Sequence, residues 1–305
     1  MKKSIFCVLT SFLLVSAMSL FAQVKQFNNN ISDFNELEIK ADFEVTLISG
    51  NSSSALFTVD EDLMEYVICR VDKKTLTIGL DEKKIPKEVK SKYKGKNAPT
   101  ATLKATITTP EHPQSIILSA KSSLYDNMGA GSVKEIKLTA TDKSMVKSLE
   151  LTAPKITLVA DKRASINSTI SCDVLSLELS GNSNSTVNCK QISKLEISTE
   201  NASSLVANGD FDLVKVNSNS NSKIIFNGSA KNAEFNCNGG SNVNASNLIV
   251  EKADVKMNSI CQLLLNVSAS LKLQKISGGA SLTYSGNPVI EMGSISKSSV
   301  TRSGK

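Results

Sequence analysis

Apolar residues recur in this chain at a spacing of two, and the pattern itself returns about every 20 residues from position 118 onward. In each repeat, an apolar residue is followed eight positions later by another, and the stretch between them is small and polar. The pairs of this ladder are Leu138/Val146, Leu158/Ile166, Leu179/Val187, Ile197/Leu205, Val216/Ile224, Phe235/Val243, Met257/Leu265 and Ile276/Tyr284. Leu118 and Ile295 extend the ladder at its two ends, and Gln274 interrupts the spacing of two.

This pattern predicts short β-strands joined by tight corners. Residues two apart lie on one face of a strand, whereas a helix needs apolar residues three or four apart. The connecting stretches, such as SGNSNS and NSNSNS, consist of residues that favour turns. A unit of this length cannot bury its own apolar face, so successive units must stack. We therefore expect an all-β parallel β-helix over residues 115–305, in which the Asn/Ser run 217–222 is a corner rather than a linker.

Residues 23–114 also have the composition of β-strands, but they do not follow the ladder. Candidate strands occupy residues 36–39, 43–48, 55–59, 75–80 and 102–108. The region is either a set of irregular first turns or a β-rich N-terminal cap, continuous with the solenoid. Some cap is expected, because an open solenoid end exposes unpaired strand edges.

Residues 1–22 predict a cleaved secretory signal peptide. Lys2 and Lys3 precede a mostly apolar stretch over residues 5–21, and the small Ala22 follows. That stretch is short for a membrane span, and Ser and Thr interrupt it. No later segment has 18 consecutive apolar residues, so we expect no stable membrane insertion of the mature chain. The expected location is beyond the inner membrane, in the periplasm or on the outer cell surface.

The mature chain keeps 33 basic residues against 29 acidic ones, a net charge of +4. With secretion, this mild charge predicts no nucleic-acid partner. The segment 83–96 (KKIPKEVKSKYKGK) nevertheless holds seven lysines and one acid. We expect a solvated loop, with contact to an anionic polymer or to lipid headgroups as the functional alternative. Its candidate binding residues are Lys90, Lys92, Tyr93 and Lys94, where Tyr93 would add a stacking surface.

The sequence offers little for metal or cofactor chemistry. His112 is the only histidine, which leaves almost nothing for a His-based zinc site or a Ser-His-Asp triad. The cysteines of the mature chain show no CxxC and no short metal-ligand spacing, and their odd number leaves at least one unpaired. They are Cys69, Cys172, Cys189, Cys237 and Cys261. We interpret them as small buried side chains and expect no cofactor.

The acidic residues do not form a recognisable catalytic motif. Asp142, Asp161, Asp173 and Asp254 fall at different positions in their repeats. Asp210 and Asp212 would share one face of an extended strand, although a solvated turn is the simpler interpretation. We expect no enzymatic activity. A polysaccharide-active enzyme stays open as an alternative, and it would need charged residues clustered on one side of the coil.

Four segments resemble one bacterial family. They are FNELEIKADFEVTLISG from Phe34, TLTIGL from Thr75, SIILSAKSSL from Ser115 and SGGASLTYSGNP from Ser277. In this order they are similar to the family described as putative auto-transporter adhesin, head GIN domain, with its Phe-led opening and its late Tyr-x-Gly-Asn-Pro element. Only two corners keep the Ser-Gly pair of that family. The resemblance implies a right-handed β-helix and an envelope or surface location, and it brings no catalytic residues.

These observations predict a non-enzymatic secreted envelope or cell-surface protein. It would act as an adhesin or interaction module through a repetitive polar β-helix surface, with surface glycans or another envelope protein as its partner. The alternative is a periplasmic binding or sensing partner of another envelope component, engaged through the segment 83–96 or the N-terminal cap.

Overall fold

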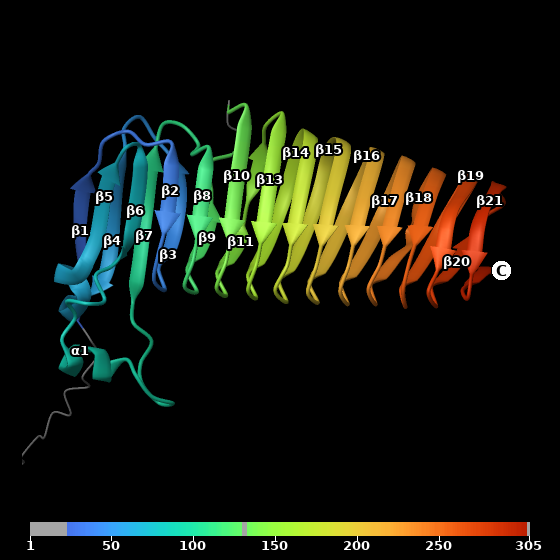
Figure 1. Cartoon of the computed structure of the whole chain (residues 1–305). Coiled ribbons are helices and arrows are strands. Elements are labelled where there is room, and N and C mark those ends of the chain that lie inside the picture. The colour runs from blue at the N-terminus through green and yellow to red at the C-terminus, as the bar shows by residue number, and fades with distance from the viewer. Residues whose placement is uncertain (1–22, 130–132, 304–305) are drawn as a thin grey trace, which may run out of the picture.

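The computed structural model describes residues 23–129 and 133–303, so the predicted signal peptide lies outside the described residues. The chain forms an elongated β-solenoid of about 10 turns with roughly 19 residues per turn (Figure 1). This confirms the predicted fold class, an all-β parallel β-helix with an irregular β-rich N-terminal cap.

Each turn of the solenoid contributes to two walls. β10 (Glu135–Ala140) lies in the first wall, β11 (Met145–Ser148) lies in the second wall, and β12 (Glu150–Thr152) lies in the bend that leads back to the first wall. A tight corner joins β10 to β11. Further along, single long strands run through the second wall, the bend and the first wall in turn. These are β14 (Ser165–Leu179), β15 (Asn184–Thr199), β16 (Ser204–Ser218), β17 (Lys223–Cys237), β18 (Asn242–Met257) and β19 (Gln262–Ser277).

The remaining strands extend both walls. The first wall also holds β5 (Val67–Asp72), β6 (Thr75–Leu80), β2 (Glu36–Ile39), β8 (Ser115–Leu118), β13 (Lys155–Ala160) and β21 (Val289–Ser296). The second wall also holds β1 (Val24–Asn30), β4 (Ser54–Asp60), β7 (Leu103–Thr109), β3 (Glu44–Ser49), β9 (Ser123–Asp126), β20 (Ser281–Ser285) and β22 (Ser299–Arg302). From β10 onward, paired residues of successive turns are mostly 19 or 20 positions apart.

The N-terminal region both begins the coil and caps it. β2 and β3 form a first turn that pairs in parallel with β8 and β9. β6 and β7 pair in parallel with their other edges, and the outer strands β1, β4 and β5 are added antiparallel. A 3-10 helix, η1 (Glu61–Tyr66), connects β4 to β5. A short helix, α1 (Lys87–Lys92), lies on a protrusion between β6 and β7 (Figure 1).

The core is a set of inward rows that run along the whole axis. One such row in the first wall joins Ile156, Leu175, Leu195 and Val214, and none of these side chains is exposed to solvent. Burying an aliphatic side chain of this size contributes roughly 1.5–3 kcal/mol. Because every turn adds similar residues, stability is spread along the solenoid rather than concentrated in one centre.

The predicted ladder is wrong in register at some repeats. Leu179 pairs with Ala160, and the residue that continues the row of Leu158 is Leu177. The same slip of two residues occurs at Met257. More than one apolar row runs inside each wall, and the first wall has three, which begin with Ile136, Leu138 and Ala140. Sequence spacing alone therefore cannot tell one row from another. A slip of two keeps the same face inward, which is why the fold is still predicted correctly.

Gln274 interrupts the ladder because it is an extra residue in β19. Leu273 and Ile276 are buried, whereas Gln274 and Lys275 both point to solvent. The next turn carries Gly293 at the matching position, where a Cβ atom would lie only 2.3 Å from the Leu273 carbonyl oxygen. The extra residue therefore occurs in two successive turns, at Gln274 of β19 and at Gly293 of β21.

The Asn/Ser run 217–222 contains a corner rather than a linker, as predicted, but the corner is residues 219–222, and Asn217 and Ser218 still belong to β16. Ser220 and Asn221 have φ angles of 53° and 63°, and the Ser222 N–H donates to the Asn219 carbonyl oxygen at 3.3 Å. The Asn221 N–H continues the stack by donating to the Gly239 carbonyl at 2.9 Å. From the corner between β8 and β9 to the corner between β19 and β20, the last residue is small and at most 1% exposed. These residues are Ser122, Ser144, Ala164, Ser183, Ser203, Ser222, Ser241, Cys261 and Ala280.

Candidate functional site: a neutral face and a basic protrusion

The outward side of the second wall, from β14 to β22, is almost free of charge. We call it the neutral face and define it by three rows of side chains. The first row is Ser165, Asn184, Ser204, Lys223, Asn242, Gln262, Ser281 and Ser299. The second row is Asn167, Thr186, Val206, Ile225, Asn244, Leu264, Thr283 and Thr301. The third row is Thr169, Asn188, Asn208, Asn227 and Asn247. Lys223 is the one charged residue in these rows.

The third row is a ladder of asparagine amides. Asn208 Nδ2 donates to Asn188 Oδ1 at 2.8 Å, Asn227 Nδ2 donates to Asn208 Oδ1 at 2.7 Å, and Asn247 Nδ2 donates to Asn227 Oδ1 at 3.1 Å. A primary amide can make more hydrogen bonds than the ladder uses. The amides are therefore held in fixed orientations, with donor and acceptor capacity left for a ligand.

The opposite side of the solenoid has a different character. A row of six consecutive ionisable residues crosses the outward side of the first wall, namely Glu196, Lys215, Glu234, Asp254, Lys272 and Glu291. Lys215 pairs with Glu234 at 3.0 Å, and Lys272 pairs with Glu291 at 3.2 Å. The two walls thus present a charged and a neutral surface built on the same repeat.

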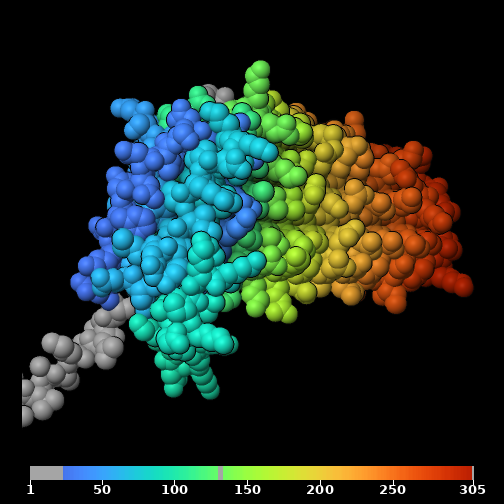
Figure 2. Space-filling model, turned by 60° about the vertical axis from the view of Figure 1, so that its left-hand side comes forward, coloured from blue at the N-terminus to red at the C-terminus, as the bar shows by residue number. Residues whose placement is uncertain are grey.

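The segment 83–96 projects from the N-terminal end, and we call it the basic protrusion (Figure 2). The lysine-rich sequence predicts a loop here, but the segment contains the short helix α1, which follows Pro86. Proline is favoured at a helix start because it has no N–H to satisfy. Ile85 is buried, and Val89 packs against the core, so the protrusion is anchored to the body by apolar contacts.

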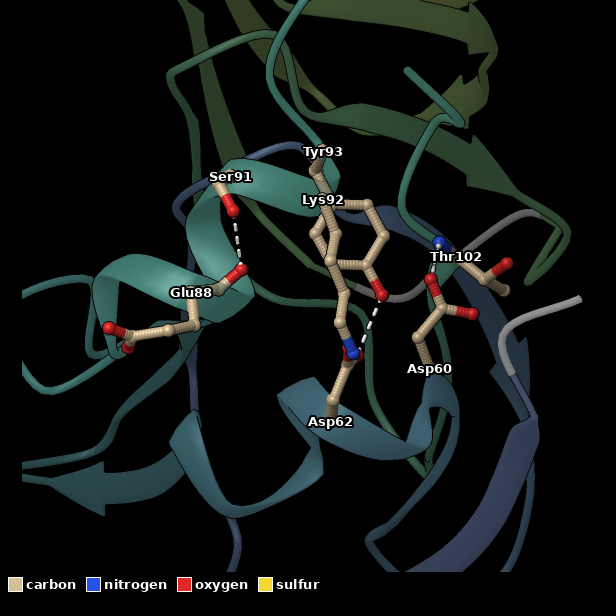
Figure 3. A network of polar contacts seen from close by, with 7 residues as sticks. All are labelled: Asp60, Asp62, Glu88, Ser91, Lys92, Tyr93 and Thr102. Carbon is tan, nitrogen blue, oxygen red and sulfur yellow. Dashed lines mark hydrogen bonds and ion pairs between the residues drawn. The ribbon is translucent and has the colours of Figure 1, made fainter. Parts of the chain in front are cut away.

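Two of the predicted site residues are tied to the body through Asp62 of η1 (Figure 3). The Tyr93 hydroxyl donates to Asp62 Oδ1 at 2.6 Å, and Lys92 Nζ lies 2.7 Å from Asp62 Oδ2. Partial burial opposes ionisation of Asp62, but the bonds from Lys92 and Tyr93 outweigh it and lower the pKa of Asp62. Burial and the bond to Asp62 raise the pKa of Tyr93. Asp62 lies 31 residues before Tyr93, and no sequence signal connects them.

The other two predicted residues, Lys90 and Lys94, are exposed. Neither forms an ion pair within residues 23–129 and 133–303, and the same is true of Lys83, Lys87 and Lys96. The structure therefore divides the predicted site. Lys92 and Tyr93 fix the shape of the protrusion, and Lys90 and Lys94 carry charge that is available to a partner.

A groove of about 630 Å³ runs along the bend between the walls. Phe211 is buried in its floor, between the exposed Asp210 and Asp212, which share one side of β16 as the spacing predicts. Asp212 pairs with Lys231 at 2.6 Å, which raises the pKa of Lys231, and Asp210 accepts a hydrogen bond from Ser229 at 2.6 Å. Charged residues do converge here, as an enzyme would need. However, both carboxylates are already engaged and exposed to water.

Residues 23–129 and 133–303 contain no group of three or more His, Cys, Asp or Glu side chains that could hold a metal ion. The five cysteines in these ranges are free thiols. No helix formed by the described residues is long and apolar enough to cross a membrane.

The sequence profile of the family described as "Putative auto-transporter adhesin, head GIN domain" matches residues 33–192 and 178–288. The chain belongs to this family. The predicted family membership is confirmed, and the match covers the first turn of the GIN-domain solenoid and most of its neutral face. A search of the curated proteins finds no match.

Several solved structures are similar to this GIN-domain chain over most of its length. A putative lipid binding protein from Parabacteroides distasonis is 15% identical, with 92% of this chain and 97% of that chain covered and a TM-score of 0.46. A putative adhesin from Parabacteroides merdae is 17% identical, with the same coverage and TM-score. A putative cell adhesion protein from Clostridium sporogenes is 13% identical, covering 75% of this chain and 99% of that chain, with a TM-score of 0.25.

Proposed function

We propose that this GIN-domain protein is a non-enzymatic adhesion module of the bacterial envelope, and that its neutral face binds a neutral, hydroxyl-rich surface such as a glycan. The observation that carries the proposal is the neutral face itself, whose aligned rows are mostly Ser, Thr and Asn, with the apolar Val206, Ile225 and Leu264, and contain no acid and one lysine. The adhesin description of the family supports the same role.

The geometry of the solenoid suits weak, repeated contacts. Layers of paired strands repeat at about 4.8 Å, so equivalent hydroxyl and amide groups recur at a fixed interval along the axis. Each contact with a sugar hydroxyl exchanges a water hydrogen bond for a protein one and gains little alone. Many contacts held in register on one rigid surface add avidity without a deep pocket. A neutral surface also avoids the cost of stripping water from charged groups.

The test compares two matched double variants of the purified protein. Asn184→Glu with Asn242→Glu places two carboxylates in the first row of the neutral face, and Ser198→Glu with Asn236→Glu places two on the outward side of the first wall. All four positions are exposed, so neither change is expected to disturb folding. Binding to immobilised dextran and mannan, and to whole cells, should fall about tenfold for the first variant only, which corresponds to roughly 1.4 kcal/mol. Equal binding by both variants would contradict the proposal.

The non-enzymatic part of the proposal needs its own assay. The protein is incubated with neutral and acidic polysaccharides, and new reducing ends are measured over time. We expect no product above a heat-denatured control. Product formation that Asp210→Asn or Asp212→Asn abolishes would instead make the groove at the bend an active site.

A second candidate function follows from the unpaired lysines of the basic protrusion. They would contact an acidic polysaccharide or another acidic envelope component, as in the predicted binding or sensing partner. Lys90→Glu with Lys94→Glu should abolish binding to immobilised alginate at low salt, whereas Lys143→Glu with Lys297→Glu should not. Retention of alginate binding by the first pair would remove this candidate.

We further propose that the protein is exported and exposed beyond the inner membrane. Protease treatment of intact cells, with lysed cells as the control, separates the outer surface from the periplasm. The basic protrusion is the expected first site of trypsin cleavage, because it is lysine-rich and projects from the body. Cleavage on intact cells supports surface display, and cleavage only after lysis places the protein in the periplasm. Resistance under both conditions, with the protein found in the cytoplasm, would contradict export.

A further inference from the structure

The two ends of the solenoid differ in how well they cover the apolar core. At the N-terminal end, the inward positions of β1 are Lys25, Phe27 and Asn29, paired with the buried Val59, Phe57 and Ala55 of β4. Lys25 pairs with Glu61 of η1 at 3.4 Å. Inward charged and polar residues on an edge strand discourage further strand pairing. This end is therefore closed.

At the C-terminal end, the described strands leave apolar inward residues exposed to solvent. Ile290, Met292 and Ile295 of β21 continue the inward rows of Leu271, Leu273 and Ile276. The latter three are at most 1% exposed, whereas Ile290, Met292 and Ile295 are 37%, 64% and 37% exposed. No described strand pairs with the outer edge of β21. The edge carries neither an inward charge nor an internal proline, the usual protections of a free strand.

We propose that the C-terminal end is a homodimer interface, in which β21 of one copy pairs antiparallel with β21 of a second copy. The two solenoids would then meet end to end and bury the open ends of their cores against each other. This contact is independent of the neutral face and therefore of the proposed function.

The sequence of β21 is self-complementary in this arrangement. Pairing centred between Met292 and Gly293 places Ile290 opposite Ile295 of the second copy, and Glu291 opposite Ser294. The extra residue at Gly293 brings Ile290 and Ile295 to the same inward side, as an antiparallel pair requires. Glu291 does not lie opposite Glu291 of the second copy, so the two carboxylates do not repel each other across the pairing. Each Glu291 keeps its ion pair with Lys272 of the same copy.

A second copy in the opposite orientation fits less well. Head-to-tail stacking would bring Met292 against an end whose inward residues include Lys25 and Asn29, and burying an ammonium group against apolar side chains is costly. It would also generate an open filament, whereas the end-to-end contact closes as a two-fold dimer. Arg302 in the inward row of β22 lies at the rim of the open end, where a long side chain can keep its charge in water.

The first experiment measures molar mass by light scattering over a dilution series of the folded full chain. We expect a dimer for the wild type and a monomer for Met292→Glu. The control Met145→Glu places the same charge at an exposed methionine in β11, far from the end, and should remain dimeric. An equimolar mixture of Met292→Glu and Met292→Lys should recover the dimer, because the two residues flank the two-fold axis. Circular dichroism melting confirms that each variant is folded.

The second experiment tests the orientation. Spin labels at Thr301→Cys, near the C-terminal end, should show dipolar coupling between copies, whereas labels at Gln26→Cys in β1 should not. A Cys69→Ser background removes the one half-buried native thiol. A wild type that stays monomeric, a dimer that survives Met292→Glu, or coupling between labels at position 26 would each overturn the proposal.

Discussion

At the scale of single residues, the corners hold residues other than glycine in a strained backbone conformation. Lys162 and Ala202 adopt φ angles of 50° and 60°, a left-handed conformation that costs a residue with a Cβ atom roughly 1–2 kcal/mol. The corners keep these residues because backbone hydrogen bonds hold each corner against the next. The Ala202 N–H, for example, donates to the Ser220 carbonyl oxygen at 2.9 Å.

This strain predicts the effect of a glycine at Ala202. Ala202→Gly should raise the free energy of unfolding by about 0.5–1 kcal/mol, because relief of the left-handed strain exceeds the entropy that glycine loses on folding. The matched control is Ala207→Gly in β16, a fully buried strand position, which should lower the free energy of unfolding by about 1 kcal/mol. Urea titrations measure both changes. A loss of stability in Ala202→Gly would show that the corner is unstrained.

The buried thiols give a second prediction at this scale. Burial raises the pKa of both Cys172 and Cys189 to about 12, so almost none of either thiol is ionised at pH 8. The thiolate is the reactive form, and we expect no labelling of either residue by a disulfide reagent in the native protein. Cys69 is half-buried and should react first, and all five should react in denaturant. Mass spectrometry of labelled peptides checks the order, and native labelling of Cys172 or Cys189 would contradict it.

At the scale of elements, much of the fold can be predicted from spacing alone. The spacing of two and the return every 20 residues fix strands, corners and stacking. The precise register cannot be predicted, because neighbouring inward rows are both apolar, and Leu177 and Leu179 are equally suitable for the row of Leu158. The presence of a β-rich cap can be predicted, but its strand pairing cannot, because the antiparallel pairings join segments with no shared period.

The candidate site was only partly predictable for a related reason. Lysine density identifies the basic protrusion, but the contact of Tyr93 and Lys92 with Asp62 depends on how η1 packs. The neutral face becomes visible only when the register is known, because its rows collect residues from eight successive turns. Sequence composition shows many Asn and Ser residues, and it does not show that they share one wall.

A buried pair that joins the segment before β8 to the end of β9 is an element-scale pH switch of stability. His112, just before β8, lies with Nε2 2.7 Å from Asp126 Oδ2 and Nδ1 3.0 Å from the Pro113 carbonyl oxygen, and both side chains of the pair are buried. A carbonyl oxygen only accepts, so Nδ1 carries a proton, and a second proton on Nε2 makes the ring a cation beside Asp126. Burial opposes that charge, but the bond to Asp126 outweighs it, and the pKa of His112 is raised above 6.5.

The raised pKa fixes the direction of the pH effect. The histidine of the unfolded chain titrates near pH 6.5, so the pair stabilises the fold fully below that pH and loses its effect as pH rises through the higher folded value. His112→Gln should therefore cost more stability at pH 6, about 3 kcal/mol, than at pH 9. Urea titrations of the wild type and of His112→Gln at both pH values measure this cost. Subtracting the two free energies of unfolding at each pH removes the contribution of the other titrating groups. An equal cost at both pH values would show that His112 is neutral when folded.

At the scale of the whole molecule, the solenoid separates tasks that share one repeat. The core needs only inward apolar rows, so the outward rows are free to become charged on one wall and neutral on the other. Each turn contacts only its neighbours, and changing the face of one turn does not alter the packing of turns further away. The ends are the exception, because there a missing neighbour leaves the core to be closed by a cap or by a partner.

This nearest-neighbour architecture predicts that a complete turn can be removed. Ser204 pairs with Lys223, which is 19 positions later, so deleting residues 204–222 places β17 directly on β15 in the correct register. The deletion also places Gly228 over Cys189, where Gly209 stands in the full chain. A Cβ atom at Gly209 would lie 2.6 Å from the Cys189 carbonyl oxygen, so only glycine fits that position.

The shortened chain should fold as a solenoid one turn shorter and unfold cooperatively, with a smaller denaturant m-value in proportion to its lost surface. The matched control deletes residues 204–213, about half a turn. It would force the later part of β16 into the second wall after the corner, with Lys215 at the inward position that Leu205 holds in the full chain, and should give an aggregated or unfolded chain. Circular dichroism, light scattering and urea titration distinguish these outcomes. If the full-turn deletion failed to fold while the half-turn deletion succeeded, stability could not be a sum over stacked turns, and the two faces could not be engineered independently.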